Sequence, residues 1–356
     1  MLNLVRVPGK LIFASCLCSL FIISALFMSS CNSGDKIPDV SAIKIDMRTQ
    51  NLEQDLAVLD TNNLAAGLVQ LRNKYPDFLN FYLDTLMGFS IHNNYSDTTS
   101  GIRLGLHLFL TNKDYRGLFD TVAKYYPNTK DVDAELANGF KFVKYYYPEY
   151  NVPEVIYLVS GLNNWGAFTF GHEVVGVGLD MFLGGQYPFY RSVGLPDYLN
   201  PHLCRAYIPV AVFSTVYQGQ HPFMTGDRPL LDMMIQKGKE QYFLHKVLPH
   251  VDDTTLFGYN SNQLEWCNNS EAMIYNFFAT RNLFYEKEFE KVMRYVNDGP
   301  NSTGMPAQSP GNIGTWLGYK IVSAYMQQHS KLTMQELLAN KDDAQAFLEA
   351  SKYKPR

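Results

Sequence analysis

The sequence predicts an α+β fold that is predominantly helical and contains one small β-sheet. Apolar residues recur at helical spacing through most of the chain, both before residue 150 and beyond residue 202. Two segments differ: 41–48 alternates apolar with polar residues, and 153–182 holds two β-branched runs. We therefore expect the sheet to come from about 41–48 and 153–182.

One leucine pattern and three further apolar segments predict the helices of the first half of the chain. Two sets of leucines fall at helical spacing, Leu52, Leu56 and Leu59 and, after Asp60-Thr61-Asn62, Leu64, Leu68 and Leu71. Pro76 ends this stretch, because proline cannot continue the hydrogen-bond ladder of a helix. Segments 78–87, 114–126 and 130–147 are predicted to be the next helices.

The middle of the chain predicts two strands separated by a turn. Residues 153–160 are apolar and β-branched, which favours a buried strand. Gly161 and the pair Asn163-Asn164 indicate a turn, and 173–180 indicates a second strand that enters a loop. Six helical patterns follow, over 203–218, 227–247, 262–285, 286–297, 312–328 and 333–350. Because no repeat or linker interrupts them, we expect one domain over 41–356.

The first 30 residues have the pattern of a secretory signal. Arg6 and Lys10 precede an apolar run over 11–30 that contains no acid. The run ends in Met28-Ser29-Ser30-Cys31, which is similar to a bacterial lipobox. We therefore predict a lipoprotein signal peptide over 1–30, lipid attachment at Cys31 and a polar tether over 31–40. An uncleaved anchor is the alternative, because the run is long enough to span a bilayer.

Composition excludes several classes of protein. The 356 residues have a formal charge of -4 and no excess of Lys or Arg, so no nucleic-acid partner is expected. Removal of Arg6 and Lys10 with the signal would make the charge -6. Five cysteines are too few for a disulfide scaffold. Cys204 and Cys267 are compatible with either one disulfide or two buried thiols.

No sequence motif identifies a catalytic residue, a metal site or a cofactor. His172-Glu173 is the one His-Glu pair, but Gly176 stands where a zinc-protease helix needs its second histidine. The surrounding valines and glycines also favour a strand rather than a helix. The chain contains neither a G-x-S-x-G nucleophile motif nor a phosphate-binding loop.

Four residues are candidates for a pocket. Asp180 and Glu271 are acids at the ends of predicted elements, where a carboxylate pair for acid–base chemistry and simple helix capping are both possible. Tyr190 belongs to an aromatic loop over 187–200 that either lines a groove for sugar or peptide or packs in the core. Trp316 lies in a glycine-rich helix start.

The C-terminal half resembles the gliding-motility-associated lipoprotein GldB family of Bacteroidetes. The resemblance is carried by segments 178–184, 187–190, 196–199 and 351–355, and most specifically by 309–322, which reads SPGNIGTWLGYKIV. It extends from about Ile43 to the C-terminus, and the lipobox of the family corresponds to Cys31.

The resemblance implies an envelope lipoprotein that is tethered to a membrane by its lipid and assists gliding motility or the associated secretion machinery. We expect a position in the outer membrane that faces the periplasm. The family is distantly similar to zinc proteases whose metal helix would correspond to the segment after Pro201. Residues 206–217 contain no His, Glu or Asp, so the resemblance implies a degenerate zincin-like scaffold with a non-catalytic, partner-binding role. An envelope peptidase or other hydrolase with an unrecognised site is the alternative.

Overall fold

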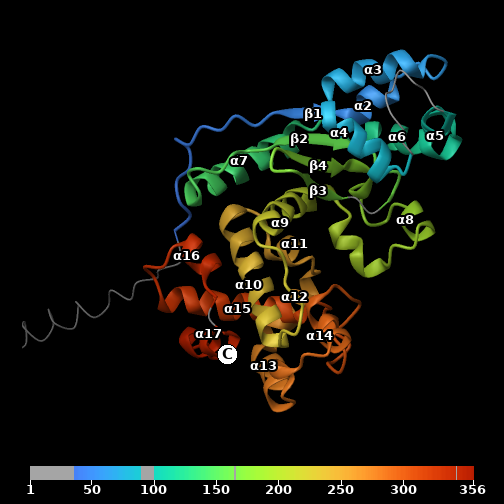
Figure 1. The fold of residues 1–356 in the computed structure, drawn as a ribbon. Helices are drawn as coiled ribbons and strands as arrows, with labels where there is room; N and C mark the ends of the chain where they lie inside the picture. The colour runs from blue at the N-terminus through green and yellow to red at the C-terminus, as the bar shows by residue number, and fades with distance from the viewer. Residues whose placement is uncertain (1–35, 90–99, 164–165, 342) are drawn as a thin grey trace, which may run out of the picture. The chain divides into compact units, whose positions relative to one another are not determined.

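The structure, a computed structural model, describes residues 36–89, 100–163, 166–341 and 343–356. Residues Asp39–Arg356 form one compact unit (Figure 1). This unit is mostly helical and contains a small mixed sheet, which confirms the α+β prediction. Among the described residues no helix is long and apolar enough to cross a membrane.

The sheet has four strands in the order β1-β2-β4-β3. The strands are β1 (Thr49–Asn51), β2 (Glu154–Leu158), β3 (Ala167–Phe170) and β4 (Val174–Gly178). β2 pairs in parallel with both β1 and β4, whereas β3 pairs antiparallel with β4 and forms an edge. In this register Val155, Val175 and Thr169 are neighbours across the sheet and therefore share one face.

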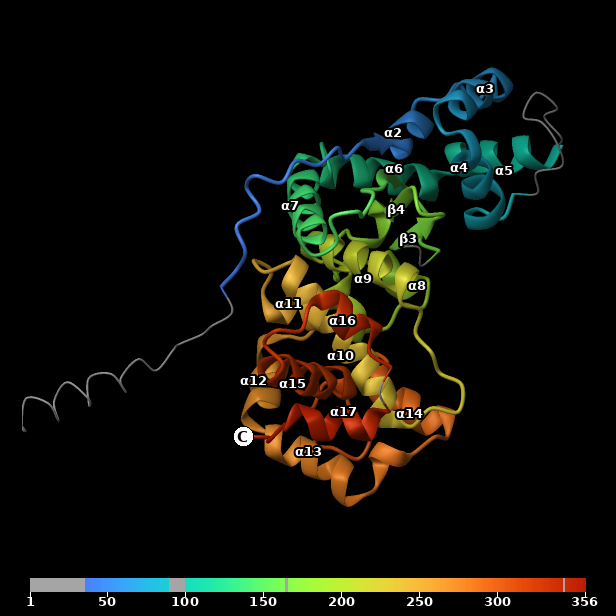
Figure 2. The same cartoon turned by 60° about the vertical axis from the view of Figure 1, so that its left-hand side comes forward.

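Different helices cover the two faces of the sheet. On the face that carries Thr169, Tyr157 donates a hydrogen bond of 2.6 Å from its hydroxyl to Asp133 of α7 (Lys130–Tyr146). The helix α9 (Ile208–Gln220) lies beside β3 in both views (Figures 1 and 2). On the opposite face, the ring of Phe168 stacks on Phe78 of α4 (Pro76–Phe81) at 6.3 Å between centroids.

The remaining elements of the first half surround the sheet, and short helices lead from β4 to α9. Before β2 these are α2 (Leu52–Ala57), α3 (Leu64–Lys74), the π-helix η1 (Tyr82–Leu86), α5 (Ser100–Thr111) and α6 (Lys113–Tyr125). After β4 they are η2 (Leu179–Met181), α8 (Phe189–Ser192), η3 (Asp197–His202) and η4 (Arg205–Tyr207).

The second half packs around two central helices, α10 (Leu230–Val247) and α15 (Ile313–Gln328). Gly238 and Gly318 let the backbones of these helices touch, because a Cβ at position 318 would overlap the Met234 carbonyl oxygen. The surrounding elements are α11 (Asp253–Phe257), α12 (Ser261–Asn269), α13 (Glu271–Thr280), η5 (Leu283–Tyr285), α14 (Phe289–Val296), α16 (Met334–Ala339) and α17 (Ala344–Ser351).

Four sequence-based assignments need correction. Segment 41–48 is not a strand, and the first strand begins at Thr49. The predicted helix 262–285 is divided at Ser270 into α12 and α13, and the predicted helix 333–350 is divided into α16 and α17. Within the aromatic loop over 187–200, residues 189–192 are helical. Cys204 and Cys267 are both free thiols in the structure.

Candidate functional site

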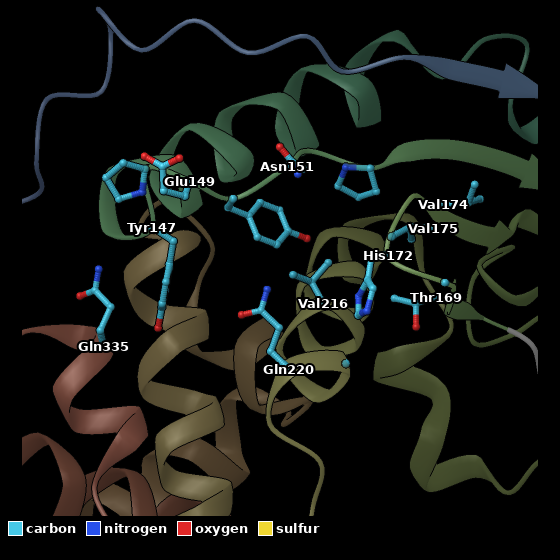
Figure 3. A pocket seen from close by; sticks show the side chains of 15 residues that line it. Tyr147, Glu149, Asn151, Thr169, His172, Val174, Val175, Val216, Gln220 and Gln335 are labelled. Carbon is cyan, nitrogen blue, oxygen red and sulfur yellow. The ribbon is translucent and has the colours of Figure 1, made fainter.

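A groove of about 530 Å³ lies beside the sheet (Figure 3). Its lining comes from the loop between α7 and β2, the β3–β4 hairpin, the C-terminal end of α9 and the start of α16. The lining residues are Tyr147, Pro148, Glu149, Tyr150, Asn151, Pro153, Thr169, Gly171, His172, Val174, Val175, Val216, Gly219, Gln220 and Gln335.

The sheet and two helix ends build this groove. Thr169 and Val175 are neighbours on the sheet face that α9 covers, and Val216 of α9 lines the groove with them. Gly219 of α9 lies close to Thr169, because a Cβ at position 219 would be in ordinary van der Waals contact with the Thr169 side chain, at 4.0 Å. At the other end, Gln335 donates a hydrogen bond from Nε2 to the Tyr146 carbonyl oxygen and ties α16 to the end of α7.

Five exposed polar side chains of the groove have no hydrogen bond or ion pair with the described part of the protein. They are Glu149, Asn151, Thr169, His172 and Gln220. Figure 3 shows them on both sides of the groove. Glu149 is the one carboxylate in the lining, which includes neither Lys nor Arg. The groove therefore offers donors and acceptors that the fold itself does not use.

Tyr147 connects the groove to a small chamber beneath it. The chamber shares Tyr147, Val216 and Gln220 with the groove and is otherwise lined by Val143, Tyr217, His221, Phe243 and Leu338. The Tyr147 hydroxyl is buried and has no hydrogen-bond partner among the described residues. Burial raises the pKa of Tyr147 to about 12, so this hydroxyl stays protonated at neutral pH and is available as a donor.

The structure brings Asp180 and Tyr190 together around the loop that follows β4. The buried Asp180 carboxylate accepts hydrogen bonds from the Ser160 amide at 2.8 Å, the Ser160 hydroxyl at 3.0 Å and the Leu162 amide at 2.8 Å. The Tyr190 hydroxyl donates to the Asp180 carbonyl at 2.9 Å and accepts from the Leu183 amide at 2.9 Å. Burial raises the pKa of Asp180, and the three donors oppose that rise.

Glu271 and Trp316 meet at a second place, through Lys320. Glu271 accepts a hydrogen bond of 2.7 Å from the Tyr353 hydroxyl, and its Oε2 lies 3.9 Å from Lys320 Nζ. The same Nζ lies 5.0 Å from the centroid of the Trp316 ring. None of the four candidate residues lines the groove of Figure 3. Cys31, the predicted lipid site, lies outside the described residues.

Two other places combine groups that are capable of acid–base chemistry. The Ser214 hydroxyl donates to Glu240 Oε1 in the contact between α9 and α10, and Lys237 Nζ lies 3.1 Å from Glu240 Oε2. A depression of about 270 Å³ carries Glu135, His250 and Asp252. No group of three or more His, Cys, Asp or Glu side chains in the described ranges is placed to hold a metal ion.

Comparison with known families assigns the chain. A family model described as gliding motility protein GldB matches residues 33–355, which is nearly the whole chain. The protein belongs to the GldB family. The resemblance inferred from the sequence is thereby confirmed, together with an association with gliding motility. No curated protein and no solved structure matched this chain significantly.

The groove of this GldB-family chain was not predicted from its sequence. The sequence contains three consecutive tyrosines at 145–147 and the pair His172-Glu173, but neither pattern indicates that the two segments meet. The available signals were local: Pro148, Asn151 and Pro153 are typical of an irregular segment after a helix, and Gly171 is typical of a turn. Their convergence depends on the pairing of β3 with β4 and on the position of α9.

Proposed function

We propose that this GldB-family protein is a lipid-anchored envelope protein that binds a partner protein of the gliding or secretion machinery, without catalysing a reaction. The observation that carries the proposal is the groove, because it gathers uncommitted polar side chains and aromatic rings in one concave surface. Its family supplies the association with motility.

The anchoring part of the proposal rests on Cys31. The lipobox-like residues Met28 to Cys31 follow a cationic and then apolar segment, and the family match begins at residue 33. Several acyl chains on Cys31 would hold the protein firmly, whereas one chain holds only marginally. We further propose a position in the outer membrane, with the protein facing the periplasm.

We also propose that the protein retains a zincin-like scaffold that has lost its metal. Helix α9 is the segment that corresponds to the metal helix of the distantly similar proteases, and it contains no His, Asp or Glu. Zinc binds through nitrogen, sulfur or carboxylate donors, which this helix does not offer. The purified protein should contain far less than one zinc per chain by metal analysis. A stoichiometric amount of zinc would contradict this part of the proposal.

The partner-binding role is tested by crosslinking in cells that contain the full chain. A photoreactive amino acid at Gln220, in the groove, should give a discrete adduct with an envelope protein. The same amino acid at Glu265, exposed on α12, is the matched control and should not give that adduct. Cys31→Ala should remove the adduct by releasing the protein from its membrane. Equal adducts from both positions, or none from Gln220, would refute the groove as the partner site.

An envelope hydrolase is the second candidate, and the depression with Glu135, His250 and Asp252 is the observation that favours it. Burial raises the pKa of Glu135, as is common for catalytic acids. If this candidate is right, Glu135→Gln should abolish cleavage of a peptide or cell-wall substrate by the purified protein. An activity that Glu135→Gln leaves unchanged would exclude this depression as its site.

A further inference from the structure

We infer that the partner enters the groove as an extended polypeptide, which adds a strand beside β3 and places a basic side chain near Glu149. This inference rests on the proposed partner-binding function and specifies the chemistry of the partner. It depends on three observations: the hydrogen bonding of the β3 edge, the uncommitted side chains of the groove, and the charge of the lining.

The register of β3 leaves backbone groups unpaired at one edge of the sheet. The Gly178 amide donates to the Gly166 carbonyl at 2.9 Å, so these two residues form a hydrogen-bonded pair. Bonding and non-bonding pairs alternate along an antiparallel ladder, which makes Phe168–Gly176 and Phe170–Val174 the next bonded pairs. The N–H and C=O groups of Ala167 and Thr169 therefore point away from β4.

The free edge opens at the groove. The Ala167 carbonyl already accepts a hydrogen bond of 3.3 Å from the Thr215 hydroxyl of α9. Thr169 is exposed, lines the groove, and has no such contact from the helix. An extended chain that approaches the edge here would find one backbone donor and one backbone acceptor, which is how β-strand addition begins.

The polar side chains of the groove are arranged in a row along the direction that an added strand would take. Figure 3 shows Gln335, Gln220, His172 and Thr169 in succession along the groove, roughly parallel to the neighbouring strands. Glutamine and asparagine side chains both donate and accept, so they match the alternating N–H and C=O groups of a peptide backbone.

The charge of the lining selects the kind of peptide. Glu149 has no ion pair in the described part of the structure, and the lining includes no Lys or Arg that would neutralise it. A partner segment with Lys or Arg at this position gains the attraction, whereas an acidic segment meets a like charge. A neutral glycan would use the rings and amides but not the β3 edge or the charge, so the polypeptide is the occupant that uses all three features.

The test uses the purified full chain in detergent micelles and an array of synthetic ten-residue peptides in which Lys or Glu is fixed at each position in turn. We expect lysine-containing peptides to be retained. Glu149→Lys should reverse the preference toward glutamate-containing peptides, while Glu265→Lys, which changes an exposed residue of α12, should leave it unchanged. Replacing single backbone amides of a retained peptide with N-methyl amides should weaken its binding about tenfold at one position near one end, because only the N–H that donates to the Thr169 carbonyl is lost there.

A variant of the protein tests the edge directly. Thr169→Pro removes the outward amide hydrogen without removing a ladder bond, since proline is tolerated at strand edges. It should weaken peptide binding by a similar factor, and Thr169→Ala should not. The inference is overturned if no peptide binds, if N-methylation has no positional effect, or if oligosaccharides bind in the groove and peptides do not. The crosslinking in cells is an independent test. A Gln220 adduct without peptide binding would refute strand addition at β3 but would still support the partner-binding function.

Discussion

Replacing Glu53 with glutamine should stabilise the protein, and the gain should grow with pH. Glu53 is the second residue of α2 and follows the fully buried Leu52. Only 5% of the surface of Glu53 is exposed. Its Oε2 has no hydrogen-bond partner among the described residues. Burial raises the pKa of Glu53 from 4.5 to about 8. The folded protein therefore favours the protonated acid, which glutamine imitates in shape and charge.

The size of the effect follows from proton linkage. The pKa of Glu53 is higher in the folded protein than in the unfolded chain. Below pH 4.5 both states are protonated and the folded protein has its full stability; as the pH rises toward 8, the unfolded chain loses its proton first and the free energy of unfolding falls. A difference of one pKa unit corresponds to about 1.4 kcal/mol, so Glu53→Gln should gain about 1 kcal/mol at pH 5 and about 3 kcal/mol at pH 7.

Urea unfolding at these two pH values measures the difference. Glu265→Gln, at an exposed glutamate of α12, is the control and should change stability by less than about 0.5 kcal/mol at either pH. A gain for Glu53→Gln that is the same at both pH values would show that the carboxyl does not titrate in this range. A loss at both would show that the carboxylate has a partner that glutamine cannot replace.

The remaining predictions concern three other features. Asp180→Ala leaves the Ser160 and Leu162 donors without an acceptor and should cost about 3 kcal/mol in urea unfolding, whereas Tyr190→Phe, which loses two hydrogen bonds, should cost about 1–2 kcal/mol. Gly318→Ala should lower the free energy of unfolding by several kcal/mol, because the new Cβ overlaps the Met234 carbonyl. Gly117→Ala in α6, whose new Cβ would have no neighbour among the described residues within 4 Å beyond the backbone of its own helix, should raise the free energy of unfolding by up to about 1 kcal/mol. Cys31→Ala should move the protein out of the detergent phase in phase partitioning, and unchanged partitioning would favour an uncleaved anchor.

The sequence predicted most helices because their core contacts repeat along one face. Leu64, Leu68 and Leu71 are spaced for one side of a helix, and all three are buried in α3. The same periodicity could not show where a helix is interrupted. Ser270 divides 262–285 while apolar residues continue on both sides, so the pattern hides the break.

The error at 41–48 has a different cause. Its alternation is real, since Ile43, Ile45 and Met47 are partly buried against the core while the residues between them are exposed. An alternating pattern reports an extended chain with one side covered, but a strand also needs a neighbouring backbone. β2 begins at Glu154 and its pairing with the N-terminal segment starts at Thr49, opposite Val155. Residues 41–48 therefore have no strand beside them, in the described part of the chain, with which to form a ladder.

The groove was beyond prediction because a binding surface depends on which polar groups remain unused after folding. Asp180 and Glu149 are both acids beside elements of the sheet, and nothing in their sequence context ranks one above the other. In the structure, Asp180 accepts three hydrogen bonds and is buried, so a ligand would have to displace donors that hold the loop over 160–162. Glu149 accepts none and lies open in a concave surface. The free energy available to a partner is therefore larger at Glu149, and we expect substitutions at Asp180 to change stability while substitutions at Glu149 change binding.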